Sequence, residues 1–148
     1  MRKILERSRK KHRHFSSVEV GNIVKSRNVV VSFLESFSSG DPYKVVDYVT
    51  DDFKNRQMGL LANSFEGKQE YLTRLDPFLN KFKNLRYEIR KVISDDCSVV
   101  VEYTMHATPE GHDICVDGVM LFVVNDSLIS ERSDYWDGLT YLRQVGLC

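Results

Sequence analysis

The spacing of apolar residues changes once along this chain, near Phe82, and that change limits the possible folds more than any other feature. Before Phe82, apolar residues recur every three or four positions, which is the stripe of a helix packed on one side. One such run is Val30, Phe33, Leu34 and Phe37. After Phe82 they recur at every second position, which is the period of a strand with one buried face. Helices first and long strands last predict an α+β domain.

Turn residues divide the first half of the chain into helices. Gly40 can end one helix in a left-handed conformation, Asp41 can cap the next, and Pro42 suits its first position. A third helical pattern covers residues 65–82, and residues 51–59 contain the start of a short strand. Three helices and one strand are therefore expected before the sheet.

The second half of the chain predicts an antiparallel meander of four strands. The strands are expected at residues 85–94, 98–108, 112–124 and 127–137. The turns between them are expected at residues 95–96, 109–111 and 125–126, which are rich in Asp, Asn, Pro and Gly.

Length and composition favour one domain with a sizeable core, since the chain has 148 residues and is 42% hydrophobic. Lys plus Arg equal Asp plus Glu at 21 each, so net charge gives no reason to expect nucleic acid. The basic residues are concentrated before His14, where Glu6 is the only acid. We expect residues 1–20 to form a flexible basic arm and residues 21–148 a single domain. Phosphate binding or a localisation signal is the alternative for the arm.

The sequence favours a cytoplasmic protein without a membrane span, a metal or a cofactor. No apolar run approaches the length of a signal peptide or a membrane helix. The three cysteines, Cys97, Cys115 and Cys148, are far apart and are expected to be reduced. His106 and His112 lack an evident third ligand, which a catalytic zinc site would need. No phosphate-binding or nucleophile-elbow motif is present in the sequence.

Three stretches carry a resemblance to a known fold: "VVSFLESFSSGD", "FEGKQEYL", and "LISERSDYWD" followed by "LRQVG". With the order of elements, they resemble the nuclear transport factor 2-like superfamily, and in particular its SnoaL-like branch of polyketide cyclase and limonene-epoxide hydrolase relatives. The resemblance covers about residues 25–146, and the spacing is most similar to that of the epoxide hydrolases. It implies a cone-shaped curved antiparallel sheet wrapped around the N-terminal helices.

In such a cone, the resemblance places a pocket between the concave face of the sheet and the helices. Pockets of this kind are mostly apolar with a few polar groups. Strand alternation puts Val101, Tyr103 and Met105, then Val116, Gly118 and Met120, then Arg132, Asp134 and Trp136 on the concave face. Phe33, Leu34 and Phe37 would form the opposite wall, with Asn55 and Gln57 at the side. The expected ligand is a small apolar molecule.

Asp134 falls where the resemblance puts a catalytic carboxylate. An apolar enclosure disfavours the charged form of a carboxyl group and makes it a useful base near neutral pH. The alternative is that Asp134 is satisfied by Arg132 or a backbone amide and only fixes the strand. Tyr103 is a candidate donor to an enolate oxygen, and a plain core aromatic is its alternative.

The sequence departs from the two best-known reactions of the fold. Epoxide hydrolases of this group use two acids bridged by an arginine, but Val101 and Tyr103 stand where the arginine and the second acid would be. Ketosteroid isomerases have a first-helix tyrosine and a first-strand base, at positions that read Phe33 and Gln57 here. A carboxylate, a phenol and amides remain, which suits proton abstraction beside a carbonyl.

Two classes of function therefore stay open. One is an acid–base enzyme of isomerase, cyclase or hydrolase type acting on a small apolar carbonyl or epoxide compound. The other is a binding or dimerisation domain without turnover, because this scaffold hosts both. The outward-facing residues Val100, Val119, Leu121 and Val123 are apolar, and for that reason we expect a homodimer through the convex face.

Overall fold

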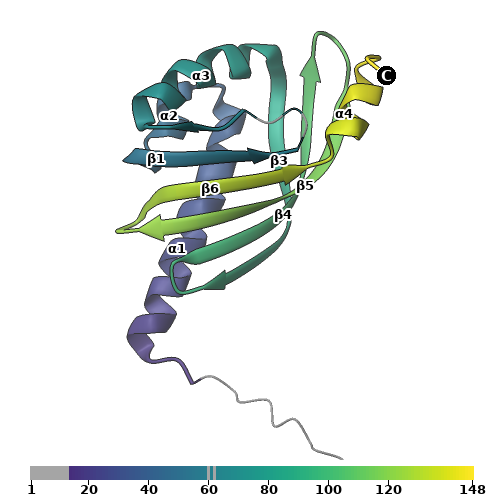
Figure 1. Cartoon of the computed structure of the whole chain (residues 1–148). Helices are drawn as coiled ribbons and strands as arrows, with labels where there is room; N and C mark the ends of the chain where they lie inside the picture. Colours follow the sequence, from purple (N-terminus) through teal and green to yellow (C-terminus); the bar gives the residue numbers. More distant parts are fainter. Residues whose placement is uncertain (1–13, 60, 62) are drawn as a thin grey trace, which may run out of the picture.

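The computed structural model describes residues 14–59, 61 and 63–148. Its elements, shown in Figure 1, are α1 (Ser17–Ser36), a 3-10 turn (Phe37–Ser39), α2 (Pro42–Val46), β1 (Val49–Met58), β2 (Phe65–Glu66), α3 (Lys68–Lys81), β3 (Phe82–Asp95), β4 (Ser98–Pro109), β5 (Ile114–Asn125), β6 (Leu128–Trp136) and α4 (Gly138–Gln144). Most of the expected arm, residues 1–13, lies outside the described residues. The rest of it enters α1 at Ser17.

Local sequence explains where the first helices begin and end. Ser16 and Glu19 form a capping box, with the Ser16 hydroxyl accepting from the Glu19 amide and the Glu19 carboxylate accepting from the Ser16 amide. Gly40 closes the 3-10 turn in the left-handed region, with φ of 67°. Asp41 then caps α2, with Pro42 at its first turn. The predicted junction between the two helices is confirmed.

The six strands form one curved, open sheet in the order β2-β1-β6-β5-β4-β3. The expected meander from β3 to β6 is antiparallel throughout. The sheet as a whole is mixed, however, because β1 pairs with β6 in parallel. That pairing joins segments far apart in sequence, so local alternation could not reveal it. Its register sets Asn55 beside Arg132 and Gln57 beside Asp134.

Two short elements were not expected from the sequence. β2 pairs with β1 and forms the edge of the sheet. α4 follows β6 directly, where the sequence pattern had suggested only the end of a strand. Asp137 caps α4 through its carboxylate, which accepts from the Thr140 amide at 3.0 Å and from the Thr140 hydroxyl at 2.6 Å.

The main core lies between the concave face of the sheet and helices α1 to α3. Figure 1 shows α1 crossing one face of the sheet, with α2 and α3 near one end of the strands and α4 at the other side. Phe33 and Leu34 of α1 and Leu75 of α3 are buried there against Val101 and Phe122 of the sheet. This arrangement confirms the predicted α+β fold.

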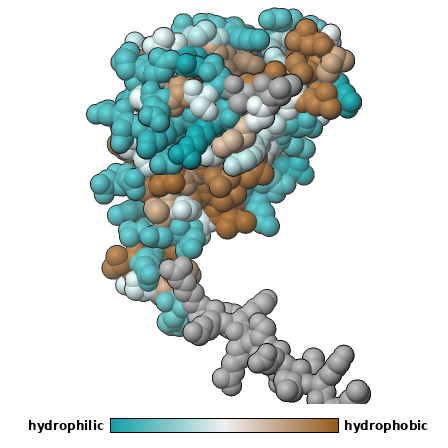
Figure 2. Space-filling model, in the orientation of Figure 1, coloured by the Kyte–Doolittle hydropathy of each residue, from teal (hydrophilic) through white to brown (hydrophobic). Residues whose placement is uncertain are grey.

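The outer face of the sheet carries an apolar patch. Figure 2 shows it as a hydrophobic area over β4 and β5. Ile93 lies opposite Val100, and Val100 lies opposite Leu121, so a row of apolar side chains crosses three strands. Ile93 and Leu121 are exposed. Among the described residues, no helix has both the length and the apolar character that crossing a membrane would require.

Candidate active site

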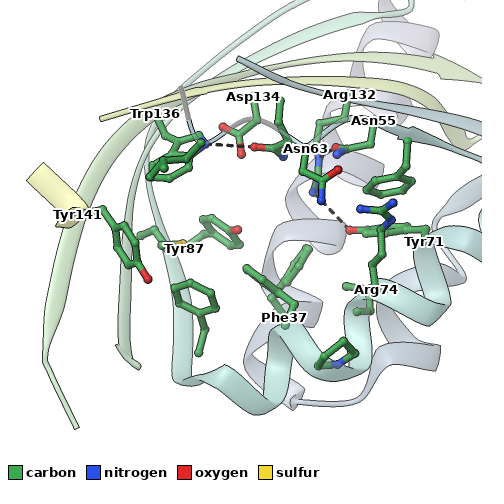
Figure 3. A pocket seen from close by; sticks show the side chains of 18 residues that line it. Phe37, Asn55, Asn63, Tyr71, Arg74, Tyr87, Arg132, Asp134, Trp136 and Tyr141 are labelled. Carbon is green, nitrogen blue, oxygen red and sulfur yellow. Dashed lines mark hydrogen bonds between the residues drawn. The ribbon is translucent and has the colours of Figure 1, made fainter. Parts of the chain in front are cut away.

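A cavity of about 410 Å³ opens between α3, α4 and the concave face of the sheet. Figure 3 shows side chains from β1, β3, β6 and both helices converging on it. Eight of its eighteen lining residues are aromatic: Phe37, Phe65, Tyr71, Phe78, Phe82, Tyr87, Trp136 and Tyr141. The polar groups are few, which is typical of a small-molecule site.

Asp134 is the only carboxylate among the described residues that line the cavity, and it is 7% exposed. Its Oδ1 accepts a hydrogen bond of 2.7 Å from the Tyr103 hydroxyl. The Gln57 side-chain amide also hydrogen-bonds this carboxyl, while the Gln57 Oε1 accepts from Trp136 Nε1 at 3.1 Å. Asp134 is therefore held in place by neutral donors.

Burial raises the pKa of the Asp134 carboxyl above its ordinary value. The charge of Arg132 and the hydrogen bonds from Tyr103 and Gln57 act in the opposite direction but do not cancel the effect of burial. A carboxyl group whose pKa is raised toward neutrality accepts and returns a proton more readily than a free aspartate does.

Tyr103 does not line this cavity. Its side chain is 2% exposed, and its hydroxyl is committed to Asp134. Burial, reinforced by the charge of Asp134, raises the pKa of Tyr103 well above its ordinary value, so the phenol stays protonated and donates. Its ring lies over Gly118, the opposite residue on β5, where a side chain would collide with it. Tyr103 thus positions Asp134, and its hydroxyl is not free for a ligand.

Arg132 is the second buried charge of the site, with 6% of its surface exposed. Its Nε donates to Asn55 Oδ1 at 2.8 Å, and its Nη1 donates to the Tyr71 hydroxyl at 3.3 Å. Among the described residues, no carboxylate lies within ion-pairing distance of it. Burial alone would lower the pKa of Arg132, but Tyr71 and Asp134 raise it, so the guanidinium is charged. The alternative in which Arg132 directly pairs with Asp134 is therefore not what the structure shows.

Strand alternation identified the correct face of the sheet but not the depth of each residue. Phe37, Asn55, Gln57, Met105, Arg132, Asp134 and Trp136 line the cavity. Phe33, Val101 and Val116 do not line it, because they are packed in the core with at most 1% exposed. Phe33 still supports the site, since the Arg132 guanidinium carbon lies 5.7 Å from the centre of its ring.

Several cavity residues were missed in the sequence. Tyr87 lies opposite Met105 in the β3–β4 ladder, so strand register would have placed it on the same face. Tyr71 and Phe78 belong to the apolar stripe of α3, whose spacing predicts a helix but does not indicate that its apolar side faces the pocket. Tyr141 comes from α4, which was not expected, and no signal in the strand pattern pointed to it.

Tyr87 supplies a free hydroxyl to the cavity. Figure 3 shows this hydroxyl pointing into the open space. Burial and the charge of Asp134 raise the pKa of Tyr87 well above its ordinary value, so it is a neutral donor. No hydrogen bond joins it to another described residue. Among all the described residues, Thr50 Oγ1 is the only fully buried side-chain nitrogen or oxygen without a partner, so the Tyr87 hydroxyl is not fully buried. The Tyr87 hydroxyl is therefore reachable from the cavity.

The two histidines considered for a metal are not brought into a ligand cluster. His106 Nε2 lies 2.9 Å from Glu88 Oε2 in an exposed pair on the outer face. His112 is exposed in the turn between β4 and β5. Within residues 14–59, 61 and 63–148, no group of three or more His, Cys, Asp or Glu side chains is arranged to hold a metal ion.

The curved six-stranded sheet with helices against its concave face is the α+β fold of nuclear transport factor 2-like proteins. The sequence profile of the SnoaL-like domain matches residues 30–132, which is more than half of the chain. The chain therefore belongs to the SnoaL-like domain family. None of the curated proteins matches the chain significantly in sequence.

Solved structures agree on the fold. A protein with a ketosteroid isomerase-like fold from Catenulispora acidiphila, solved in complex with trimethylamine, is 16% identical with a TM-score of 0.75, and the match covers 81% of this chain and 93% of that one. An LEH-like epoxide hydrolase from Mycobacterium tuberculosis is 19% identical with a TM-score of 0.73, and the match covers 82% of this chain and 90% of that one. A candidate SnoaL-like polyketide cyclase from Jannaschia is 16% identical with a TM-score of 0.75, covering 92% and 99%. At these identities the likeness concerns the fold alone.

Proposed function

We propose that this chain is an enzyme in which Asp134 removes and returns a proton on a small, largely apolar carbonyl compound. The observation that carries the proposal is the state of Asp134 itself. Its carboxyl group faces an aromatic cavity, its pKa is raised by burial, and neutral donors fix its orientation. A carboxylate in such a place is suited to general base catalysis.

The proposed step is abstraction of a proton from the carbon next to the carbonyl. The C–H electron pair moves into the carbon–carbon bond, the carbonyl oxygen becomes an enolate oxygen, and the proton passes to Asp134. The Tyr87 hydroxyl is free and points into the cavity, so it can donate a hydrogen bond to that oxygen. Tyr87 takes the role for which the sequence had suggested Tyr103.

The number of carboxyl groups in the cavity favours a carbonyl substrate over an epoxide. Opening an epoxide with water, as the two-acid enzymes do, needs one carboxylate to take a proton from the water and a second, protonated carboxyl group to donate a proton to the leaving oxygen. Asp134 is the only carboxylate of the described lining residues. Proton transfer beside a carbonyl can be completed by the same carboxyl group, which returns the proton at another carbon.

The competing proposal is a binding protein of the same shape without turnover. It is supported by the hydrogen bonds that hold Asp134, since a fully satisfied carboxylate can serve only to order the cavity wall. The two proposals differ in one measurable property. An enzyme of the proposed kind exchanges the α-hydrogens of its ligand with solvent, and a binding protein does not.

The experiment is deuterium wash-in from D2O, followed by proton NMR on a panel of apolar ketones and β-dicarbonyl compounds. We expect Asp134→Asn to slow exchange by roughly 10²- to 10⁴-fold, the usual contribution of a positioned base. Asp117→Asn is the matched control, because Asp117 is exposed on the outer face of β5. Wild-type exchange at the background rate, or an equal rate in Asp134→Asn, would refute the enzymatic proposal.

A further inference from the structure

Arg132 has hydrogen-bonding capacity that the protein does not use. A guanidinium carries several N–H donors in a planar fork, and two of those of Arg132 are committed, to Asn55 and Tyr71. Both partners are neutral. The remaining donors are reachable from the cavity, since Arg132 lines it and Thr50 Oγ1 is the only fully buried side-chain polar atom left without a partner among the described residues.

A buried cation without a carboxylate partner is unfavourable unless something else compensates its charge. Asp134 stands two residues away on β6, and its charge acts on Arg132 from a distance. It makes its hydrogen bonds with Tyr103 and Gln57, however, and forms no ion pair with the guanidinium. Figure 3 shows Asp134 toward the Trp136 end of the cavity and Arg132 toward the Tyr71 end. The guanidinium therefore faces a part of the cavity that contains no acid among the described lining residues.

A second arginine lines the same end. The Arg74 guanidinium carbon lies 5.0 Å from the ring centre of Phe65, and the Arg132 guanidinium carbon lies 5.4 Å from that of Tyr71. The Phe65 and Tyr71 rings are stacked with centres 5.3 Å apart. Two cations thus flank one aromatic stack at the cavity wall. Glu70 pairs with Arg74 at 2.6 Å, which leaves Arg132 as the cation without an ionic partner.

We infer that the Arg132 end of the cavity binds a carboxylate group of the ligand, so that the substrate is an aromatic or alicyclic acid that also carries the carbonyl. The planar donor fork of arginine matches a carboxylate well, and the aromatic wall suits an apolar ring. The inference names the substrate class of the proposed site and rests on that proposal for the location of the cavity. It does not require that proton transfer occurs.

The test compares matched acids and amides, which differ in charge and hardly in shape. The probes are 2-naphthoate with 2-naphthamide, and adamantane-1-carboxylate with adamantane-1-carboxamide. Binding is measured by calorimetry for both pairs. The adamantane pair is also followed by the fluorescence of Trp136, the only tryptophan of the chain, which lines the cavity.

We expect the wild type to bind at least one acid roughly 10- to 100-fold more tightly than its amide, the usual size of a charge-assisted hydrogen bond. Arg132→Gln should abolish this preference, and Arg132→Lys should retain part of it. Arg90→Gln is the matched control, because Arg90 is exposed on the outer face. Circular dichroism melting shows whether each variant is folded.

Three outcomes would overturn the inference: equal binding of acid and amide, no binding of any probe, or an acid preference that persists in folded Arg132→Gln. If Arg132→Gln does not fold, Arg132→Lys is used in its place. This variant should keep part of the preference for the acid, and a complete loss of that preference in folded Arg132→Lys would overturn the inference. Asp134→Asn separates the two proposals. It should keep the acid preference even if the wild type shows no proton exchange, in which case only the enzymatic proposal fails.

Discussion

Replacing Gly118 with alanine should damage the site without touching any residue that lines it. Gly118 lies on β5 between Tyr103 of β4 and Trp136 of β6. A Cβ atom added there would lie 2.5 Å from Tyr103 Cζ, closer still to the Tyr103 hydroxyl, and 2.8 Å from the backbone oxygen of Tyr135. The Tyr103 ring would have to move, and with it the hydroxyl that donates to Asp134.

The size of the effect follows from these contacts. Overpacking a well-packed site costs about 1–3 kcal/mol, and the upper half of that range applies because one of the colliding atoms belongs to the backbone. Gly→Ala returns about 0.5–1 kcal/mol through a less flexible unfolded chain. The net loss is about 1–2.5 kcal/mol, which for a domain of this size lowers Tm by roughly 2–10 °C.

The assay is a thermal melt combined with the wash-in measurement. Gly21→Ala is the control with the same chemical change, since Gly21 lies in α1 and nothing stands within 4 Å of its added Cβ. It should stabilise the protein by about 0.5–1 kcal/mol. A Gly118→Ala protein that melts at the wild-type temperature and exchanges at the wild-type rate would show that Tyr103 does not need its position over Gly118.

Three more predictions concern the carboxyl group and the outer face. Tyr103→Phe removes a hydrogen bond that lowers the pKa of Asp134, so the acidic limb of the pH–rate profile should move to higher pH; an unmoved limb would exclude this role. Because the folded-state pKa of Asp134 is raised, wild-type stability falls as pH rises above about 3.9 and through that folded pKa. In urea unfolding between about pH 4 and pH 8, the stability of Asp134→Asn relative to the wild type should therefore increase as the pH rises. An increase of this relative stability as the pH falls would contradict a raised pKa of Asp134. We also propose a homodimer through the outer face, so Leu121→Glu should give monomers on sizing; unchanged dimers, or a monomeric wild type, would remove that interface.

Local sequence patterns were sufficient for most of the sheet. Alternation identified the strands of the meander, and it put Arg132, Asp134 and Trp136 on the face that lines the cavity. Alternation has a period of two and reports only the face. It does not report which residues on that face are covered by a helix, which is why Val101 and Val116 were expected in the pocket and lie in the core.

Contacts between segments far apart in sequence determine how the site residues are paired. The parallel pairing of β1 with β6 brings Gln57 to Asp134 and Asn55 to Arg132, and no short-range pattern carries that information. The sequence does not show that the Tyr103 hydroxyl is already hydrogen-bonded, because its partner Asp134 lies 31 residues further along the chain. The start of α4 could have been predicted from the sequence, since Asp137 is a preferred helix N-cap residue and its carboxylate accepts from the Thr140 amide.

The most direct test of Asp134 as a buried base is the titration of its carboxyl carbon by NMR, assigned by comparison with Asp134→Asn. The expected pKa of Asp134 lies above the roughly 3.9 of a free aspartate, because burial outweighs the charge of Arg132 and the donors that hold the carboxylate. A pKa at or below that value would contradict this expectation and would leave Asp134 as a structural charge on the sheet.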